Sequence, residues 1–404
     1  MAYIIFVNPS ILAEAGMPAA AVSAATCVSA GLASILMGAL ARYPIAMAPG
    51  MGLNAYFTYG VVKGMGVPWE TALGAVFLSG LLFLLLTALG VRRWIVESIP
   101  RPLYSATAVG IGLFIALIGL KNAGVVAASP ATILTLGNLR APATLLSLAG
   151  LLLTAALLIV GFRAAILLGA AATTAAAVAL GLSRIAVGAP PLEALAQTAF
   201  HLNIPAAFQL GLAEIVFAFL FVDLFDNLGT LLAVANRAGL IEKDGQIPRI
   251  GRILSADSLA TIAGSLSGTS TVVSYIESAA GVAAGGRSGV TAIVTGLCFL
   301  AALWVAPFLG VIPSAATAPA LILVGALMMA HTAEIDWANL RDSIPAFLTI
   351  VAIPMTFSIA NGLSLGFLSF TLLQLLTGRA RHVPPFVYAL SAILLARFLY
   401  LGSG

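Results

Sequence analysis

Apolar segments separated by short turn-forming stretches follow one another along the whole chain, and this pattern restricts the possible folds more than any other feature. We count about fourteen segments, several of them shorter than the roughly 20 residues that a helix needs to cross a bilayer. Hydrophobic residues form 61% of the chain and charged residues 8%, whereas soluble domains carry about 25% charged residues. The sequence therefore predicts an all-α, polytopic membrane protein, with a polar loop from about residue 121 to residue 143.

Two segments contain residues that interrupt a helix. They are residues 43–57, in the third segment, and residues 264–278, in the tenth. The first contains Pro49, which lacks a backbone donor, and both are rich in residues of low helix propensity. Non-helical backbone at membrane depth is tolerated only where it is buried or lines a cavity. Interrupted segments at matching places in two halves indicate an inverted repeat with a binding site near the middle of the bilayer.

Seven segments in each half would place the two halves in opposite orientation. We expect a first repeat over residues 1–207, whose first segment is short, and a second over residues 208–404, which ends in an interfacial helix at residues 383–400. The two half-helices would meet with their N-termini, where partial positive charge and unpaired N–H groups attract acceptor atoms. Asn54 and Glu277 lie just inside these half-helices.

A pair of carboxylates lies near the end of the apolar segment at residues 214–230. Asp223 and Asp226 are three residues apart, so they share one face of a helix. An ionised carboxylate that faces lipid costs several kcal/mol, so both side chains should face a polar cavity inside the bundle. We interpret this stretch as part of a binding site that faces Asn54 and Glu277.

The distribution of basic residues predicts the orientation in the membrane. When both termini are cytoplasmic, fourteen of the eighteen Lys and Arg residues fall on the cytoplasmic side, and only Lys63, Lys121, Arg140 and Arg184 fall outside. This is the bias described by the positive-inside rule, and it predicts a multi-pass protein of the inner membrane. The net charge of +4 belongs to these loops and does not indicate a nucleic-acid partner.

The sequence contains no pattern for a cofactor, a metal or a catalytic residue. Cys27 and Cys298 lie far apart in apolar runs, and the three histidines lack metal-ligand spacing. No nucleotide-binding motif is present. Gly110 and Gly112 lie in an apolar segment, where they predict close helix packing.

Six stretches together resemble the AzgA-like purine permeases of the nucleobase/ascorbate transporter superfamily: FVNPSIL, ARYPIAMAPGMGLNAYF, GIGLFIALIGL, FVDLFDNLGTL, ADSLATIAGSLSGTSTVVSYIESAAG and GGRSGVTA. The resemblance implies a seven-plus-seven inverted repeat, divided into a core domain at about residues 1–95 and 208–310 and a gate domain at about 100–205 and 315–380. It also implies import of purine bases, namely adenine, guanine or hypoxanthine, together with protons. A homodimer stays open.

Residue by residue, the resemblance implies essential polar positions at Asn54, Asp223, Asp226, Asp257 and Glu277. Asn227 departs from the family, which usually has Thr at this place. The chain also begins where the family has a cytoplasmic segment and the first half of span one, so we expect a start that is misassigned or truncated.

The chemistry of a purine fits these residue types. A carboxylate accepts two N–H groups from one edge of a base in charge-assisted hydrogen bonds. We expect Glu277 and Asp226 to hold the base, with the amide of Asn54 and backbone N–H groups near Gly52 and Thr271 completing the contacts.

The coupled proton requires a further group, and Asp223 or Asp257 would carry it, because burial disfavours the charged form of a carboxyl group. Two alternatives stay open. The polar residues could have purely structural roles, and the chain could be an anion transporter or channel with the same repeats, which predicts a basic or neutral centre. An enzyme would need a nucleophile with its base, or a metal cluster, and neither is evident in the sequence.

Overall fold

The computed structural model describes residues 1–90, 99–162, 164–183, 190–209, 213–240, 247–305 and 312–400, and these are mostly helical. The helices of the first half are α1 (Ile4–Ala13), α2 (Ala19–Leu36) with its continuation η1 (Met37–Ala41), α3 (Met51–Ala55) with its continuation η2 (Tyr56–Gly64), α4 (Trp69–Ala88), α6 (Arg101–Asn122), α7 (Pro142–Ile159), α8 (Ala165–Ala179), α9 (Pro191–Leu195) and α10 (Ile204–Gln209). Those of the second half are α11 (Ala213–Ala238), α12 (Ile250–Ser267), α13 (Ser278–Ala283), α14 (Gly289–Ala302), α15 (Ser314–Met328) with η4 (Met329–Glu334), α16 (Leu340–Thr356), α17 (Ile359–Leu376), η5 (Ala380–His382) and α18 (Pro385–Tyr400).

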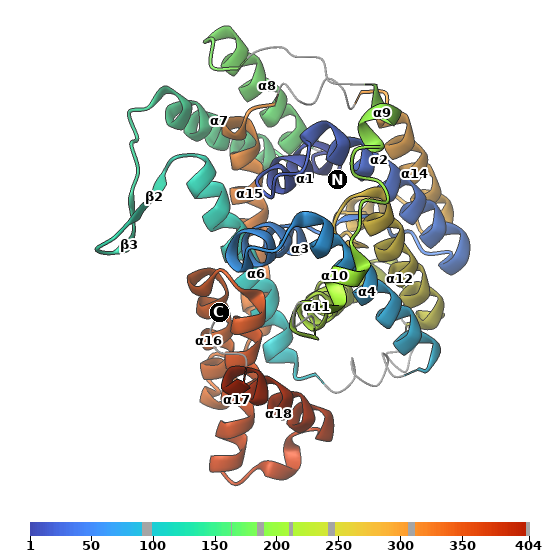
Figure 1. The fold of residues 1–404 in the computed structure, drawn as a ribbon, viewed down its shortest axis with the longest axis vertical. Coiled ribbons are helices and arrows are strands. Elements are labelled where there is room, and N and C mark those ends of the chain that lie inside the picture. The colour runs from blue at the N-terminus through green and yellow to red at the C-terminus, as the bar shows by residue number, and fades with distance from the viewer. Residues whose placement is uncertain are drawn as a thin grey trace.

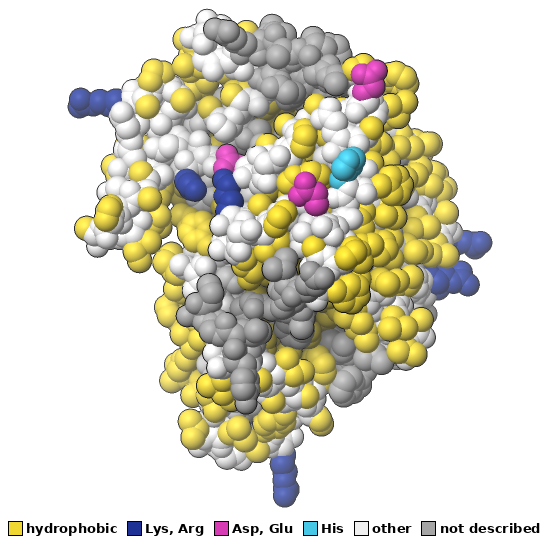
Figure 2. All heavy atoms as spheres, viewed as in Figure 1, with side chains coloured by type: hydrophobic (Ala, Val, Ile, Leu, Met, Phe, Trp, Pro, Cys, Tyr) yellow, Lys and Arg dark blue, Asp and Glu magenta, His cyan; other side chains and the backbone are white. Residues whose placement is uncertain are grey.

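Long apolar helices make the chain a multi-pass membrane protein. Within the described ranges, six helices are long and apolar enough to cross a bilayer: Ala19–Ala41, Trp69–Ala88, Arg101–Asn122, Pro142–Ile159, Ser314–Glu334 and Ile359–Leu376. Figure 2 shows hydrophobic side chains over much of the visible described surface, with few charged groups among them. Large aliphatic side chains such as Leu152 and Leu297 are exposed, which suits contact with lipid.

The helices pack in two groups (Figure 1). In one group α2 packs on α12 and α14, and α12 packs on α4. In the other, α6 packs on α15 and α16, α16 packs on α17, and α7 packs on α8 and α15. Helix α18 packs on α17, so the predicted tail helix forms, although its place relative to the bilayer stays a prediction.

Small residues allow several of these helices to approach closely. A Cβ atom built on Gly112 of α6 would lie 2.7 Å from Cβ of Met328 and 3.0 Å from the carbonyl oxygen of Gly325. On Gly110 it would lie 2.6 Å from Cδ1 of Ile353. The prediction of close packing at Gly110 and Gly112 is therefore confirmed, and it follows the use of small residues where membrane helices meet.

Two small antiparallel sheets interrupt the helices. Strand β1 (Met47–Pro49) pairs with β4 (Val272–Ser274), and β2 (Val126–Ser129) pairs with β3 (Ile133–Leu136). The first sheet lies in the two segments where non-helical backbone was predicted. The second forms a hairpin where the sequence predicted only a polar loop, and Ile133 turns the chain there with a φ of 66°. The described chain is thus a helical membrane protein with two short sheets.

Candidate functional site

In each interrupted region, a residue in the left-handed conformation ends the helix that comes before the strand. Arg42, with φ 59°, follows η1, and Gly268, with φ 88°, follows α12. A Cβ atom on Gly268 would also lie 2.3 Å from Oγ1 of Thr198, so this position requires glycine for two reasons. After each turn comes a buried three-residue strand, and after each strand a new helix, α3 or α13.

The two strands pair in antiparallel register, with Met47 opposite Ser274 and Pro49 opposite Val272. We call this pairing the strand crossing. Beyond the strands, the N–H of Gly50 donates to the carbonyl of Thr271 at 2.9 Å. Because every backbone polar group inside a membrane protein needs a partner, this pairing explains how two non-helical stretches can lie within the bundle.

Side chains complete the hydrogen bonds that the short strands leave open. The hydroxyl of Ser34 accepts from the N–H of Met47 at 2.9 Å and donates to its carbonyl at 3.0 Å. The N–H of Ala46 donates to Oγ of Ser278 at 3.0 Å. The hydroxyl of Tyr275 donates to the carbonyl of Pro49 and ties the second segment to the first.

A cavity of about 250 Å³ lies beside this crossing. It is lined by Gly50, Met51, Gly52, Tyr104, Ala108, Ile111, Ile115, Thr230, Val273, Ser274, Tyr275, Ile276, Glu277, Val324, Leu327, Met328 and His331. Its walls thus come from both interrupted segments, from α6 and α11, and from α15 with η4. The volume is close to the lower end of the roughly 300–1,000 Å³ range of ligand pockets, which suits a small ligand.

Two of the predicted binding residues, Gly52 and Glu277, line this cavity. A Cβ atom on Gly52 would lie 2.6 Å from Cγ2 of Ile111, so α3 and α6 meet closely at the cavity wall. Asn54 and Thr271 are completely buried but do not line the cavity. Asp226 belongs to α11, but its side chain lies outside what the structure describes.

The two predicted proton carriers are buried behind the cavity wall. Asp223 and Asp257 are each 1% exposed, and neither lines the cavity. The amide of Asn227 donates to Oδ1 of Asp257 and accepts, through its oxygen, the N–H of Ser274 at 3.2 Å. Since Ser274 lines the cavity, Asn227 connects Asp257 to the cavity wall.

Asn54 has an unusual environment for a buried amide. Its backbone N–H donates to the carbonyl of Gly50 at 2.8 Å in the first turn of α3. Within the part of the chain that the structure describes, neither of its side-chain amide atoms has a hydrogen-bond partner. Buried polar groups nearly always have one, so this amide is available to a ligand.

Several residues of the cavity were not predicted from the sequence. Tyr275 was visible in the second interrupted segment but was not distinguished from packing aromatics. Tyr104 and His331 come from α6 and η4, whose sequences give no sign that they reach the site. The ring nitrogen Nδ1 of His331 lies 3.2 Å from Oε1 of Glu334, and the hydroxyl of Ser105 donates to the other oxygen of Glu334 at 2.7 Å.

The cavity is mostly apolar with a single carboxylate. Among the lining residues, Glu277 is acidic and His331 is titratable, and the described lining includes no Lys or Arg. The hydroxyl of Tyr3, which precedes α1, donates to Oε1 of Glu277. Such a cavity can accept N–H donors from a small, flat and nearly neutral ligand, whose faces would lie against the aliphatic and aromatic walls.

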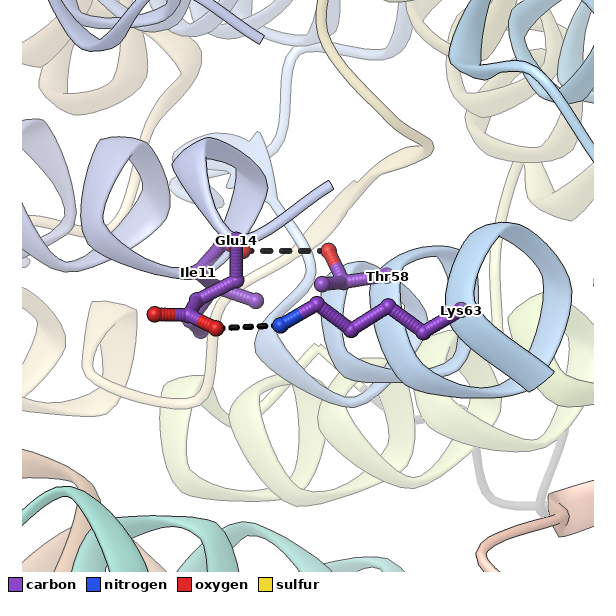
Figure 3. Close-up of polar contacts among 4 residues, drawn as sticks. All are labelled: Ile11, Glu14, Thr58 and Lys63. Atoms are coloured by element: carbon purple, nitrogen blue, oxygen red, sulfur yellow. Dashed lines mark hydrogen bonds and ion pairs between the residues drawn. The ribbon is translucent and has the colours of Figure 1, made fainter. Parts of the chain in front are cut away.

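Helix α1 is attached at its far end to η2, the helix that continues the first interrupted segment. Figure 3 shows the hydroxyl of Thr58 donating to the carbonyl of Ile11, at 3.1 Å, and the ammonium of Lys63 paired with Glu14. Both Thr58 and Lys63 belong to η2, so α1 and η2 are held together at this point.

A bundle of apolar spans around a small cavity, with two interrupted segments crossing at its wall, defines a membrane transport protein. The profile described as "Permease family" matches residues 1–365. The chain belongs to this family, and within it to the AzgA-like purine permeases of the nucleobase/ascorbate transporter superfamily. It is not an enzyme.

Three relatives match nearly the whole chain. A protein of Methanocaldococcus jannaschii is 52% identical over 406 residues, which cover 100% of this chain and 93% of the relative. The adenine permease AdeP of Escherichia coli is 42% identical over 405 residues, 100% of this chain and 91% of AdeP. The guanine/hypoxanthine permease PbuG of Bacillus subtilis is 43% identical over 413 residues, 99% of this chain and 94% of PbuG.

Two solved structures share the fold. The transmembrane domain of the cyanobacterial bicarbonate transporter BicA superposes with a TM-score of 0.66 at 18% identity, covering 90% of this chain and 94% of that domain. The murine Solute Carrier 26 family member A9 anion transporter superposes with a TM-score of 0.67 at 11% identity, covering 93% of this chain and 66% of that protein.

Proposed function

We propose that the chain is a secondary active transporter that imports purine nucleobases, namely adenine, guanine or hypoxanthine, by proton symport. The observation that carries the proposal is the carboxylate of Glu277 in a small, mostly apolar cavity whose described lining includes no Lys or Arg. Relatives that match almost the whole chain are named for adenine and for guanine and hypoxanthine, which supports purines as the substrate class.

The proposed binding mode follows from the donors and acceptors of the site. Glu277 accepts N–H groups from one edge of the base, and the backbone at Gly52 lies on the opposite side of the base. Asp226, the amide of Asn54 and the backbone near Thr271 supply further contacts. These contacts require a movement of the core domain, because Asn54 and Thr271 do not line the cavity described above. A site built to pair such groups rejects analogues that lack them, because its own polar atoms would stay buried and unpaired.

In this proposal the coupled proton is carried by Asp223 or Asp257. Both are buried, and the link from Asp257 through Asn227 to Ser274 supports communication between the proton carrier and the cavity. Protonation of a buried carboxyl would change its hydrogen bond to Asn227 and thereby the strand β4 that forms part of the cavity wall.

The proposal includes the architecture expected of such a transporter: about fourteen segments in two inverted repeats. The core domain would comprise residues 1–95 and 208–310, and the gate domain residues 100–205 and 315–380. The packing of α2, α4, α12 and α14 in one group, and of α6, α15, α16 and α17 in another, supports this division. Both termini would be cytoplasmic at the inner membrane, and a homodimer stays a prediction.

The alternative is an anion transporter with the same fold, which the likeness to a bicarbonate and an anion transporter favours. At 18% and 11% identity that likeness concerns the fold alone. An anion in the cavity would lie beside the carboxylate of Glu277, without a Lys or Arg in the described lining to offset the repulsion. The purine proposal therefore has the stronger support.

Uptake measurements in cells without their own purine permeases test the proposal. Labelled adenine, guanine, hypoxanthine and uracil are supplied with and without a proton uncoupler, and labelled bicarbonate and chloride are supplied in parallel. We expect saturable, uncoupler-sensitive uptake of at least one purine. Uptake of an anion but of no base, by protein that has reached the membrane, would replace the purine proposal with the anion alternative. Purine uptake that is insensitive to the uncoupler would exclude proton symport but would still support purines as the substrate class.

A further inference from the structure

The hydrogen bond between Tyr3 and Glu277 joins residues 274 positions apart in the sequence. Tyr3 is 3% exposed, so its hydroxyl lies inside the protein, and it donates to Oε1 of the carboxylate that lines the cavity. A carboxylate has two oxygens, and a donor fixed on one of them restricts the rotation of the whole group. The orientation of Glu277 is thus set from outside the two interrupted segments.

Helix α1 holds this hydroxyl in place through contacts along its length. The side-chain amide of Asn8 donates to Oγ1 of Thr26 and to Oγ1 of Thr269, both at 2.8 Å. Thr269 lies just before β4, so α1 is attached to the second interrupted segment near the strand crossing.

At the other end of α1, Thr58 and Lys63 attach it to η2, as Figure 3 shows. Helix α1 is therefore fixed to the second interrupted segment and to η2, the helix that continues the first one, with Tyr3 at one end and Glu14 at the other. A side chain with two χ angles on such a helix keeps its hydroxyl at a defined position relative to the cavity.

We infer that Tyr3 is a positioning residue for substrate binding: it holds Oε1 of Glu277 and thereby presents Oε2 to an N–H donor of the ligand. This inference rests on the proposed function, because it assigns the role through the base that Glu277 binds. It makes the direction of the contact between Oε2 and the base dependent on α1.

The substitution Tyr3→Phe removes only the hydroxyl and tests the inference. We expect the KM for the transported purine to rise about tenfold, as expected for losing a hydrogen bond to a charged group, while Vmax and the amount of protein in the membrane stay within about twofold. The purified variant should also show a smaller rise in melting temperature on addition of the purine.

Tyr43→Phe is the matched control. Tyr43 is 1% exposed, and its hydroxyl donates to the carbonyl of Pro248 at 2.9 Å, away from the cavity. Both variants lose one partly buried hydrogen bond, so both melting temperatures without ligand should fall, and only Tyr3→Phe should change KM.

The outcomes separate the inference from the proposed function. If the wild-type protein takes up a purine and Tyr3→Phe has the KM of the wild type or of Tyr43→Phe, Tyr3 is structural and the inference is wrong. If Tyr3→Phe lowers Vmax without changing KM, positioning for binding is likewise excluded. If the wild-type protein neither binds nor takes up any purine, the proposed function fails, and the role inferred for Tyr3 fails with it.

Discussion

Glu277 is where the chemistry of the cavity is concentrated, because it is the acidic residue among the described lining side chains. It lies between β4, which ends at Ser274, and α13, which begins at Ser278, so its backbone is held by a strand on one side and a helix on the other. Two tyrosines flank it in space: Tyr275 binds the carbonyl of Pro49, and Tyr3 binds the carboxylate itself.

Replacing this carboxylate tests its role directly. Glu277→Gln keeps the size of the side chain but removes its charge and one acceptor, so we expect Vmax/KM for purine uptake to fall at least about 100-fold, equivalent to about 2.7 kcal/mol. Initial uptake rates over a range of purine concentrations measure the effect. Glu193→Gln, at an exposed position on α9, should leave uptake unchanged. Equal uptake by both variants would exclude Glu277 from the binding site.

Gly52 has a steric role that can be measured separately. A Cβ atom there would lie 2.6 Å from Cγ2 of Ile111, so Gly52→Ala should force α3 and α6 apart and destabilise the protein by about 1–3 kcal/mol. Thermal unfolding of the purified protein gives the measurement. Adding Ile111→Ala should restore part of the lost stability, because it removes the atom that clashes. A double variant less stable than both single variants would contradict this explanation.

At the scale of single residues, the sequence located the site better than it assigned contacts. Gly52 and Glu277 line the cavity. Sequence reasoning could find them because the half-helix pattern that identified them is local in sequence. Thr271 does not line the cavity although its neighbours Val273 and Ser274 do, and the spacing of these residues in the sequence does not distinguish them. His331 was not predicted, because only the packing of distant helices brings η4 to this cavity.

Asn227 acts at the scale of elements, since it joins α11, α12 and β4. Its amide donates to Asp257 of α12, and its oxygen accepts from the N–H of Ser274 in β4. The family resemblance identified this position only as a departure from Thr. The structure shows a reason for an amide here: Asn has both the donor and the acceptor that the two neighbours require.

Removing this amide should therefore affect several elements together. Asn227→Leu leaves the N–H of Ser274 and one oxygen of Asp257 without their present partner, and each unsatisfied buried group costs about 1–3 kcal/mol. We expect a clear loss of thermal stability. Asn227→Thr, the usual residue of the family, should be less damaging in the same unfolding measurement. If Leu is tolerated as well as Thr, the link between the three elements has no energetic importance.

Helix α14 packs against the continuous helix formed by α2 and η1, and this contact gives a second prediction at the scale of elements. A Cβ atom on Gly38 would lie 2.4 Å from the carbonyl oxygen of Gly289. Gly38→Ala should separate these helices and lower the melting temperature, because backbone cannot move aside as a side chain can. Gly251→Ala is the control, since a Cβ atom there meets nothing within 4 Å and alanine favours helix. Equal melting temperatures for the two variants would contradict the prediction.

The elements that the sequence predicted well are those with a local signal. Prolines and glycines in residues 43–57 and 264–278 indicated non-helical backbone, and both segments contain a strand. The pairing of those strands could not be predicted, because it depends on hydrogen bonds from Ser34 and Tyr275 that the pattern does not reveal. The β2–β3 hairpin was missed because its strands are short and exposed, where composition resembles that of a loop.

For the whole molecule, the orientation in the membrane follows from the distribution of basic residues. Arg140 and Arg379 are both exposed, and the proposed orientation places them on opposite sides. In a Cys298→Ser background, where the remaining Cys27 is buried, Arg140→Cys should react in intact cells with a thiol reagent that cannot cross membranes. Arg379→Cys should react only after the membrane is permeabilised. The reverse pattern would invert the orientation and the assignment of both termini.

The fold was predictable in class, as a helical membrane protein, because hydropathy reports directly on membrane spans. The arrangement of the helices in two packing groups was not readable from the spacing of residues, since it depends on contacts such as Gly112 with Gly325 that are distant in sequence.

The strand crossing also determines when the site can form during synthesis. Pro49 and Tyr275, which the crossing joins, are 226 residues apart, so β1 enters the membrane long before its partner has left the ribosome. Until then its backbone groups have only local partners such as Ser34. Contacts of such long sequence separation form late, so the cavity is among the last parts of the molecule to be completed. A nascent chain that ends before β4 can insert its first spans but lacks part of the cavity wall.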